Sequence, residues 1–228
     1  MNWTCVHTGK TGDLMARDML SKPLLWGVGT VRTLRAHWVL NELGIDYETQ
    51  PVKPRTDTME RADFLAVNPD KKVPVLQHGD LTLVESSAIM IYLAETYADR
   101  APGLIPQDRI QRARVFEWMS FISTELDAAS LYTIRKHQDL EHIYGSAPIA
   151  VDSAGDYFLR MVRKPARVLV SGQRYLLGDQ FTLPDILLFT CLRFADRMGV
   201  QRPAEFDTYY NMLAERPAFQ AAERANYP

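Results

Sequence analysis

The sequence of 228 residues has few cysteines, no long hydrophobic run and no surplus of charge of either sign. Its two cysteines, Cys5 and Cys191, cannot form a disulfide framework and match no zinc-ligand spacing, which is typical of a reduced compartment. No stretch approaches the ~18 apolar residues that span a bilayer. With 26 Lys and Arg against 28 Asp and Glu, the chain lacks the basic surplus of nucleic-acid-binding proteins. The sequence therefore predicts a cytoplasmic protein without nucleic-acid or membrane partners.

Residues 1–22 form a polar tail. Charged side chains interrupt every apolar stretch in this tail, so it lacks the hydrophobic segment of a signal peptide. Met15 and Met19 offer alternative translation starts within it. We therefore leave residues 1–22 out of the fold prediction.

From residue 23 the chain alternates between short apolar runs and helical periodicity. The run from Leu24 to Trp26 leads into a glycine-rich loop, which is typical of a buried strand. Apolar residues at three- and four-residue spacing then predict a helix that ends at Gly44. The predicted order is β-α-β-α-β-β-α, with the later elements at 47–52, 59–67, 73–77 and 81–84 and a last helix from Ser86.

Residues 99–107 contain two prolines and a glycine and predict a linker, because they break both patterns. After this linker only helical periodicity is visible. Thr182 and Asp185 form the signature of a capping box at the start of one of the later helices. The sequence thus predicts an α/β domain over 23–98 and an all-helical domain over 108–228, with helices at 109–140, 156–170, 183–198 and 209–224 and with Pro165 and Pro217 interrupting two of them.

Two short segments of the α/β domain are candidate binding elements. If the peptide bond between Val73 and Pro74 is cis, the Val73 backbone is free to pair with an extended ligand; an ordinary trans proline that opens a strand is the alternative. Glu85 and Ser86 stand between a strand and a helix, where free amides attract anions. A ligand carboxylate on Ser86 and a ligand ammonium on Glu85 fit this position, and a solvated acid and a plain helix cap are the alternatives.

Together these motifs resemble those of the cytosolic glutathione transferases. The resemblance covers about residues 23–224 and includes the element order and the all-helical second half. It implies a thioredoxin-like glutathione-binding domain followed by an all-helical substrate-binding domain. The motifs are Val73-Pro74-Val75-Leu76, Glu85-Ser86-Ser87-Ala88, residues 38–48, residues 177–185 and Arg216-Pro217-Ala218-Phe219.

The resemblance also implies how glutathione is bound. Val73 would pair its backbone with the cysteinyl unit, and Pro74 would be cis. Glu85 and Ser86 would hold the γ-glutamyl end. Lys72 would contact the glycine carboxylate, for which a basic residue is suited. One departure is Lys71, which stands where the family commonly has glycine.

The residue that activates the thiol is expected in the loop before the first helix, where the family places a hydroxyl or a thiol. Counting back from Gly44 leads to Thr30 or Val31, and only Thr30 can donate a hydrogen bond from its side chain. Thr33 is an alternative, and Arg32 could add positive charge. A purely structural helix cap is the other interpretation of Thr30. Because the loop contains no Tyr or Cys, the sequence favours a bacterial-type, serine/threonine-like branch of the family.

The second substrate is expected between the two domains, against the first long helix of the second domain. Trp118, Phe121 and Tyr132, and with them Arg135, are candidates for lining an apolar pocket; the alternative is that the aromatic residues belong to the core. No residue spacing predicts a metal site.

The resulting prediction is a transferase of alkyl or aryl groups that conjugates glutathione with a small hydrophobic electrophile in detoxification. Glutathione is then a cosubstrate, and no permanently bound cofactor is expected. The resemblance also implies a homodimer. The alternatives are a glutathione-dependent reductase of disulfides or peroxides, and a non-catalytic glutathione-binding interaction module of the same fold.

Overall fold

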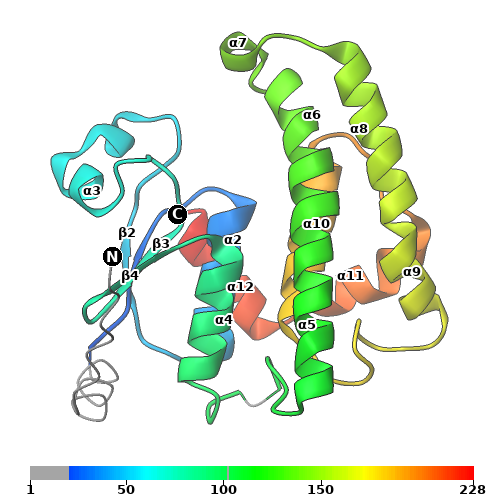
Figure 1. Cartoon of the computed structure of the whole chain (residues 1–228), viewed down its shortest axis with the longest axis horizontal. Coiled ribbons are helices and arrows are strands. Elements are labelled where there is room, and N and C mark those ends of the chain that lie inside the picture. Colours follow the sequence, from blue (N-terminus) through cyan, green and yellow to red (C-terminus); the bar gives the residue numbers. More distant parts are fainter. Residues whose placement is uncertain (1–20, 102) are drawn as a thin grey trace, which may run out of the picture.

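The computed structural model describes residues 21–101 and 103–228. Cys5 and nearly all of the predicted polar tail lie outside the described residues. The described chain forms a small α/β unit followed by a larger group of helices, and the two lie side by side (Figure 1). This arrangement confirms the predicted fold class, a thioredoxin-like unit with an all-helical second half.

The α/β unit is built on a four-stranded sheet with the order β2-β1-β3-β4. Strand β1 (Leu24–Trp26) pairs in parallel with β2 (Glu48–Gln50) and antiparallel with β3 (Val75–His78), which forms a hairpin with β4 (Leu81–Val84). The predicted order of strands and helices is confirmed. Its helices are α2 (Val31–Glu42), α3 (Ala62–Val67), which follows the short 3-10 turn η1 (Asp57–Glu60), and α4 (Ser86–Thr96).

Successive side chains of the strands point to opposite faces of the sheet, and each face is covered. Leu25 and Leu76 belong to the large core that helices α2 and α4 share with the helical half. Trp26 and Val75 face the other way, where Phe64 of α3 covers them in a second, smaller core. Figure 1 shows α2 and α4 between the sheet and the helical half, which places the start of α2 at the junction of the two.

The helical half differs from the prediction in its first long helix. The predicted continuous α-helix over 109–140 is α5 (Arg109–Phe121), a π-helical segment η2 (Ile122–Leu131) and α6 (Tyr132–His137). The amide of Tyr132 donates to the carbonyl of Asp127, with the wider spacing of a π-helix. Hydrophobic periodicity did not reveal this segment, which lies beside the cavities described below.

The remaining helices follow the prediction with shifted ends. Pro217 opens the last helix instead of interrupting one, since the predicted helix over 209–224 is two helices. Pro165 lies in the first turn of a helix that begins after a break at Val162. The further elements are α7 (Glu141–Tyr144), α8 (Pro148–Met161), α9 (Arg163–Val170), α10 (Leu183–Arg197), η3 (Ala204–Phe206), α11 (Asp207–Ala214) and α12 (Pro217–Asn226).

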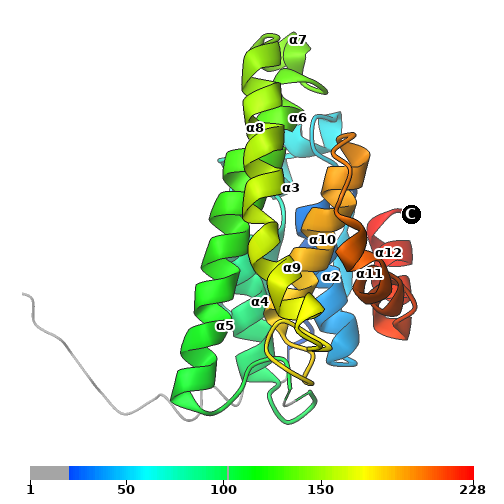
Figure 2. The same ribbon diagram turned by 90° about the vertical axis from the view of Figure 1, so that its right-hand side faces the viewer.

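Helix α10 runs through the middle of the helical half and is almost entirely buried. Its predicted capping box is confirmed, because the Asp185 carboxylate accepts from the Thr182 amide at 2.9 Å. Helix α12 lies against α2 (Figure 2), where Trp38 packs on Phe189 and Phe219. The last helix is therefore part of the junction that carries the site. Within the described residues, no helix combines the length and apolarity needed to cross a membrane.

Candidate functional site

The loop between β1 and α2 forms the floor of the site, and glycine makes this loop possible. Gly27 has φ 122°, and a Cβ at this position would lie 2.6 Å from the Cβ of Val73. A side chain at residue 27 would therefore push the loop away from the Val73 segment. The glycine keeps the start of α2 and the Val73 segment in direct contact.

Thr30 is the N-cap of α2. Its Oγ1 accepts from the Thr33 amide at 3.0 Å, and its own amide donates to Thr33 Oγ1 at 3.0 Å. This capping box confirms the structural role that the sequence allowed for Thr30. The side chain nevertheless lines a cavity, so a cap and a ligand contact are compatible at this position.

Thr33 is fully buried and lines none of the cavities found over the described residues. Its hydroxyl donates to Asn226 Oδ1 at 2.6 Å. The alternative assignment of Thr33 as the activating group therefore does not fit the structure, because its only proton is already used inside the protein. The Thr30 hydroxyl lies 3.0 Å from Thr33 Oγ1 and can donate its proton to it.

Asn226 is a residue that the sequence analysis missed. The Gly29 amide donates to its carbonyl at 2.8 Å, and its side-chain amide donates to the Thr30 carbonyl at 3.0 Å. Together with the bond from Thr33, these contacts join the end of α12 to the loop before α2. No local sequence pattern predicts these contacts, since Asn226 and residues 29–33 lie at opposite ends of the described chain.

The Val73–Pro74 peptide bond is cis. Beside it, Lys71 has φ 53°, in the left-handed region that favours glycine, so its backbone adopts the conformation expected of the family's glycine. Its ammonium pairs with Glu60 at 2.7 Å. Glu85 also has a positive φ of 68° and is the residue before helix α4.

The first cavity, which we call the Ser86 cavity, has a volume of about 400 Å³. It brings together predicted binding residues from two separate segments: Lys72, Val73 and Pro74 from one, and Glu85 and Ser86 from the other. Ser86 is buried at the first turn of α4, whereas Glu85 is exposed. The cavity therefore offers a cation, a carboxylate and a helix N-terminus to one extended ligand.

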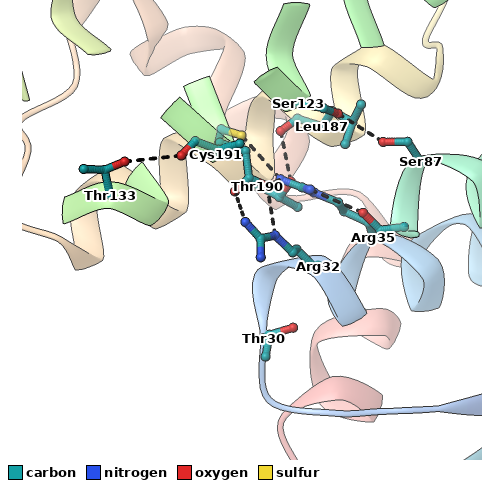
Figure 3. Close-up of polar contacts among 12 residues, drawn as sticks. Thr30, Arg32, Arg35, Ser87, Ser123, Thr133, Leu187, Thr190 and Cys191 are labelled. Carbon is teal, nitrogen blue, oxygen red and sulfur yellow. Dashed lines mark hydrogen bonds and ion pairs between the residues drawn. The ribbon is translucent and has the colours of Figure 1, made fainter. Parts of the chain in front are cut away.

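Its inner wall carries a buried charge network (Figure 3). Arg32 and Arg35 project from α2 toward the helical half, and both pair with Asp127 of the π-helical segment, at 2.7 and 2.8 Å. Burial alone would raise the pKa of Asp127, but the two guanidinium groups hold it below its usual value. Arg35 also donates to Thr190 at 2.8 Å and to Ser86 at 3.4 Å. Asp127 thus holds Arg35 in place, and Arg35 in turn holds the Ser86 hydroxyl.

The second cavity, which we call the Arg135 cavity, has a volume of about 250 Å³ and opens beside the start of α2. Thr30, Arg32, Lys72 and Tyr132 are among its lining residues, and the last three also line the Ser86 cavity. Of the predicted residues, Lys72 and Tyr132 therefore lie where the two cavities meet, and Thr30 lines the Arg135 cavity. Arg135, the further candidate for the pocket lining, also lines this cavity.

Trp118 and Phe121 line neither cavity, which corrects their assignment to the electrophile pocket. Trp118 is buried, and the two rings pack edge to face at 5.9 Å. The Lys164 ammonium of α9 lies over both, 4.6 and 4.4 Å from the ring centroids. Their helix turns this face toward α9, so the alternative interpretation as packing residues fits the structure.

Cys191 is buried, and burial raises the pKa of its thiol to about 12. A thiol in this state is a poor nucleophile at neutral pH. Over the residues that the structure describes, no group of three or more His, Cys, Asp or Glu is placed to hold a metal ion.

Comparisons with known proteins agree with this geometry. The family model described as the N-terminal domain of glutathione S-transferase matches residues 23–95, and the C-terminal domain model matches residues 151–217, together more than half of the chain. Glutathione S-transferase 3 of Zea mays is 31% identical over 82% of this chain and 86% of its own length. GstA of Escherichia coli O157:H7 is 30% identical over 83% of this chain and 92% of its own length.

Solved structures give the same result. The theta class glutathione S-transferase of Xanthomonas axonopodis pv. citri, solved with glutathione bound, superposes with a TM-score of 0.75. It is 26% identical, and the match covers 92% of this chain and 99% of that one. The chain belongs to the glutathione S-transferase family.

Proposed function

We propose that the protein is a glutathione transferase that binds glutathione in the Ser86 cavity and delivers its thiolate to an electrophile in the Arg135 cavity. The observation that carries the proposal is the position of Thr30, whose side chain lines the Arg135 cavity next to Val73 at the N-terminus of α2. A helix N-terminus and a hydroxyl donor together favour a thiolate at this point.

Glutathione fits the Ser86 cavity as an extended tripeptide. Its α-carboxylate would accept from Ser86 at the start of α4, and its ammonium would pair with Glu85. The Val73 backbone would pair with the cysteinyl unit, and Lys72 would take the glycine carboxylate. This path ends with the sulfur at the junction of the two cavities, beside Thr30.

Thr30 is proposed to activate the thiol, which places the protein in the serine/threonine-like branch. Its Oγ1 accepts from the Thr33 amide and lies 3.0 Å from Thr33 Oγ1, so its proton would turn from Thr33 Oγ1 to the sulfur when glutathione binds. A free thiol has a pKa of about 8.5. A hydrogen bond to a charged acceptor contributes about 1.5 to 3 kcal/mol, enough to lower that pKa by about 1 to 2.

The test is a titration of protein-bound glutathione, followed by the ultraviolet absorbance of the thiolate, in Thr30→Val and Thr30→Ser. Thr30→Val should raise the pKa of the bound thiol by about 1 to 2 and lower turnover of chlorodinitrobenzene about 10- to 100-fold. Thr30→Ser should retain most of both. The exposed Thr82→Val serves as the control. An unchanged thiol pKa in Thr30→Val would disprove the role of Thr30.

The reductase and binding-module alternatives give different results in the same assays. A reductase would turn over disulfides or peroxides faster than chlorodinitrobenzene, and a binding module would retain glutathione without turning over any of them. If Glu85→Ala and Ser86→Ala together leave glutathione affinity intact, the proposed binding mode is wrong.

The homodimer, the cytoplasmic location and the domain boundaries at 98 and 108 remain predictions. Sedimentation at several concentrations tests the first, fractionation of cells tests the second, and limited proteolysis tests the third. Proteolysis should cut first within 99–107 if this segment is the linker.

A further inference from the structure

The walls of the Arg135 cavity carry an unusual balance of charge. Its lining includes five cationic residues and no Asp or Glu: Arg32, Arg55, Lys71, Lys72 and Arg135. Two of these cations have ion-pair partners inside the protein: Arg32 pairs with Asp127, which it shares with Arg35, and Lys71 pairs with Glu60. The cavity thus holds more positive charge than the described residues balance.

Arg135 and Arg55 have no ion-pair partner among the described residues. The Nε of Arg135 is buried and has no hydrogen-bond acceptor among the described residues, which costs free energy. Burial, followed by the positive charges of Arg55 and Arg197, lowers the pKa of Arg135, and Asp139 opposes this only in part. The two guanidinium groups therefore repel each other across the space that they line.

Glutathione does not account for these two cations. Its α-carboxylate is assigned to Ser86 and its glycine carboxylate to Lys72, so both of its negative groups already have partners. Arg135 lines only the Arg135 cavity, on α6 of the helical half, and Arg55 faces it from the loop after β2. A second anion between them would balance their charge and remove their repulsion.

The rest of the cavity is apolar. Val31, Met59 and Phe194 contribute aliphatic and aromatic surface, and Tyr132 and Tyr144 add rings. A ligand that fits this lining has a compact apolar body with one acidic group at its edge. A planar carboxylate matches the fork of an arginine better than a spherical anion does.

We infer that the electrophile is a carboxylate, held by Arg135 and Arg55 while its apolar body faces Thr30. This inference rests on the proposed function and narrows the predicted hydrophobic electrophile to an acidic one. The reaction is a substitution: the glutathione sulfur forms a bond to the electrophilic carbon, the bond from that carbon to its leaving group breaks, and the thiol proton passes to solvent.

The experiment compares two substrates that differ in one charge, a para-chloro-dinitrobenzoate and the matching benzamide. In both, sulfur displaces chloride from the same ring carbon. Each kcat/KM is divided by the uncatalysed rate with glutathione, which removes the difference in intrinsic reactivity. The ratio of the two normalised values, benzoate over benzamide, measures selectivity for the anion.

The ratio should exceed one in the unmodified protein and fall about 10- to 100-fold in Arg135→Gln. Arg55→Gln should lower it in the same direction by less, because Arg55 is exposed. Arg135→Lys should restore part of it. The control is Arg163→Gln, an exposed arginine of α9 outside both cavities, which should leave the ratio unchanged. A ratio that changes less than twofold in both Arg135→Gln and Arg55→Gln would overturn the inference.

A binding measurement separates this inference from the proposed function. The glutathione conjugates of the benzoate and the benzamide are titrated into the protein by calorimetry, at low and high salt. Tighter, salt-sensitive binding of the carboxylate conjugate, lost in Arg135→Gln, supports the acidic site even if neither substrate is turned over, in which case only the transferase proposal fails. Equal affinity for both conjugates, with normal turnover of the benzamide, refutes the acidic site alone.

Discussion

The two cavities at the N-terminus of α2 share Arg32, Lys72, Val73 and Tyr132. They differ in whether the other arginines in their walls have a counterion. Behind the Ser86 cavity, the buried cation Arg35 pairs with the Asp127 carboxylate, so this cation has a counterion before any ligand binds. In the Arg135 cavity, Arg55 and Arg135 face each other without a counterion among the described residues.

The difference has a physical meaning. A wall whose buried cation has a counterion holds its geometry without a ligand, which suits a cosubstrate that is bound in one orientation. A wall of unpaired cations is completed only when an anion enters, which suits selection between substrates. Removing a charge should therefore damage folding in the first cavity and selectivity in the second.

The largest effect is expected for Asp127→Asn, which removes the carboxylate and leaves Arg35 buried with no counterion. Removing one partner of a buried ion pair typically costs about 3 to 5 kcal/mol of unfolding free energy. Urea denaturation followed by circular dichroism measures the loss. Asp152→Asn, an exposed acid on α8, is the control and should change stability by less than about 0.5 kcal/mol. Equal losses in the two variants would show that the network does not stabilise the fold.

A slightly smaller effect is expected from His37, which contacts the loop between β1 and α2. Its ring is fully buried, between the Gly27 carbonyl at 3.2 Å and the Tyr47 hydroxyl at 2.8 Å. Burial lowers the pKa of His37 to about 4, against the opposing effect of the Gly27 bond. Unfolded protein takes up this proton near pH 6.5 and folded protein only near 4. The contribution of His37 to stability is therefore complete above pH 6.5 and declines as the pH falls toward 4.

The total decline is about 3 kcal/mol for a pKa difference of this size. Proton NMR should show the His37 imidazole titrating near pH 4. Unfolding free energies at pH 7 and pH 4.5 should differ less in His37→Asn than in the exposed control His142→Asn. An imidazole that titrates near its ordinary value would contradict this prediction.

Most of the fold could be predicted from the sequence, because its strands, turns and helix ends depend on residues that are close together in the chain. Strand β1, the hairpin and the capping box of Thr182 and Asp185 each arise from neighbouring residues, and each was found where predicted. The π-helical segment and the helix break before Pro217 were missed. Hydrophobic spacing does not distinguish a π-helix from an α-helix. A proline is common in the first turn of a helix, so Pro217 marked the start of a new helix and not an interruption within one.

The candidate site was predictable only where its residues lie in motifs. Val73, Pro74, Glu85 and Ser86 belong to short segments and were found to line one cavity. Asp127 and Asn226 act through contacts between residues far apart in the chain, so no local pattern marks them. Trp118 and Phe121 were assigned by helical spacing, which does not tell which neighbour a helix face meets; here it is α9.

Asn226→Ala should have an intermediate effect, about 2 kcal/mol of unfolding free energy, because it leaves the Thr33 hydroxyl without its acceptor and the Thr30 carbonyl without a donor. Chemical denaturation measures it, with the exposed Asn211→Ala as control. Asn226→Asp keeps the acceptor for Thr33 but places a buried carboxylate oxygen against the Thr30 carbonyl, so its loss should be at least as large as that of Asn226→Ala. A loss in Asn226→Ala no larger than in the control would mean that α12 does not fix the loop before α2.

The smallest effect on stability is expected for a substitution in the Arg135 cavity. Arg135→Gln removes a charge that is held near Arg55 and Arg197 without an ion-pair partner among the described residues. The repulsion lost should offset the packing lost, so the unfolding free energy should change by no more than about 0.5 kcal/mol. Denaturation of Arg135→Gln beside Asp127→Asn measures the contrast directly. A loss above about 1 kcal/mol in Arg135→Gln would show that Arg135 stabilises the fold. The proposed difference between the Ser86 cavity, whose buried arginine has a counterion, and the Arg135 cavity, whose arginines lack one, would then be wrong.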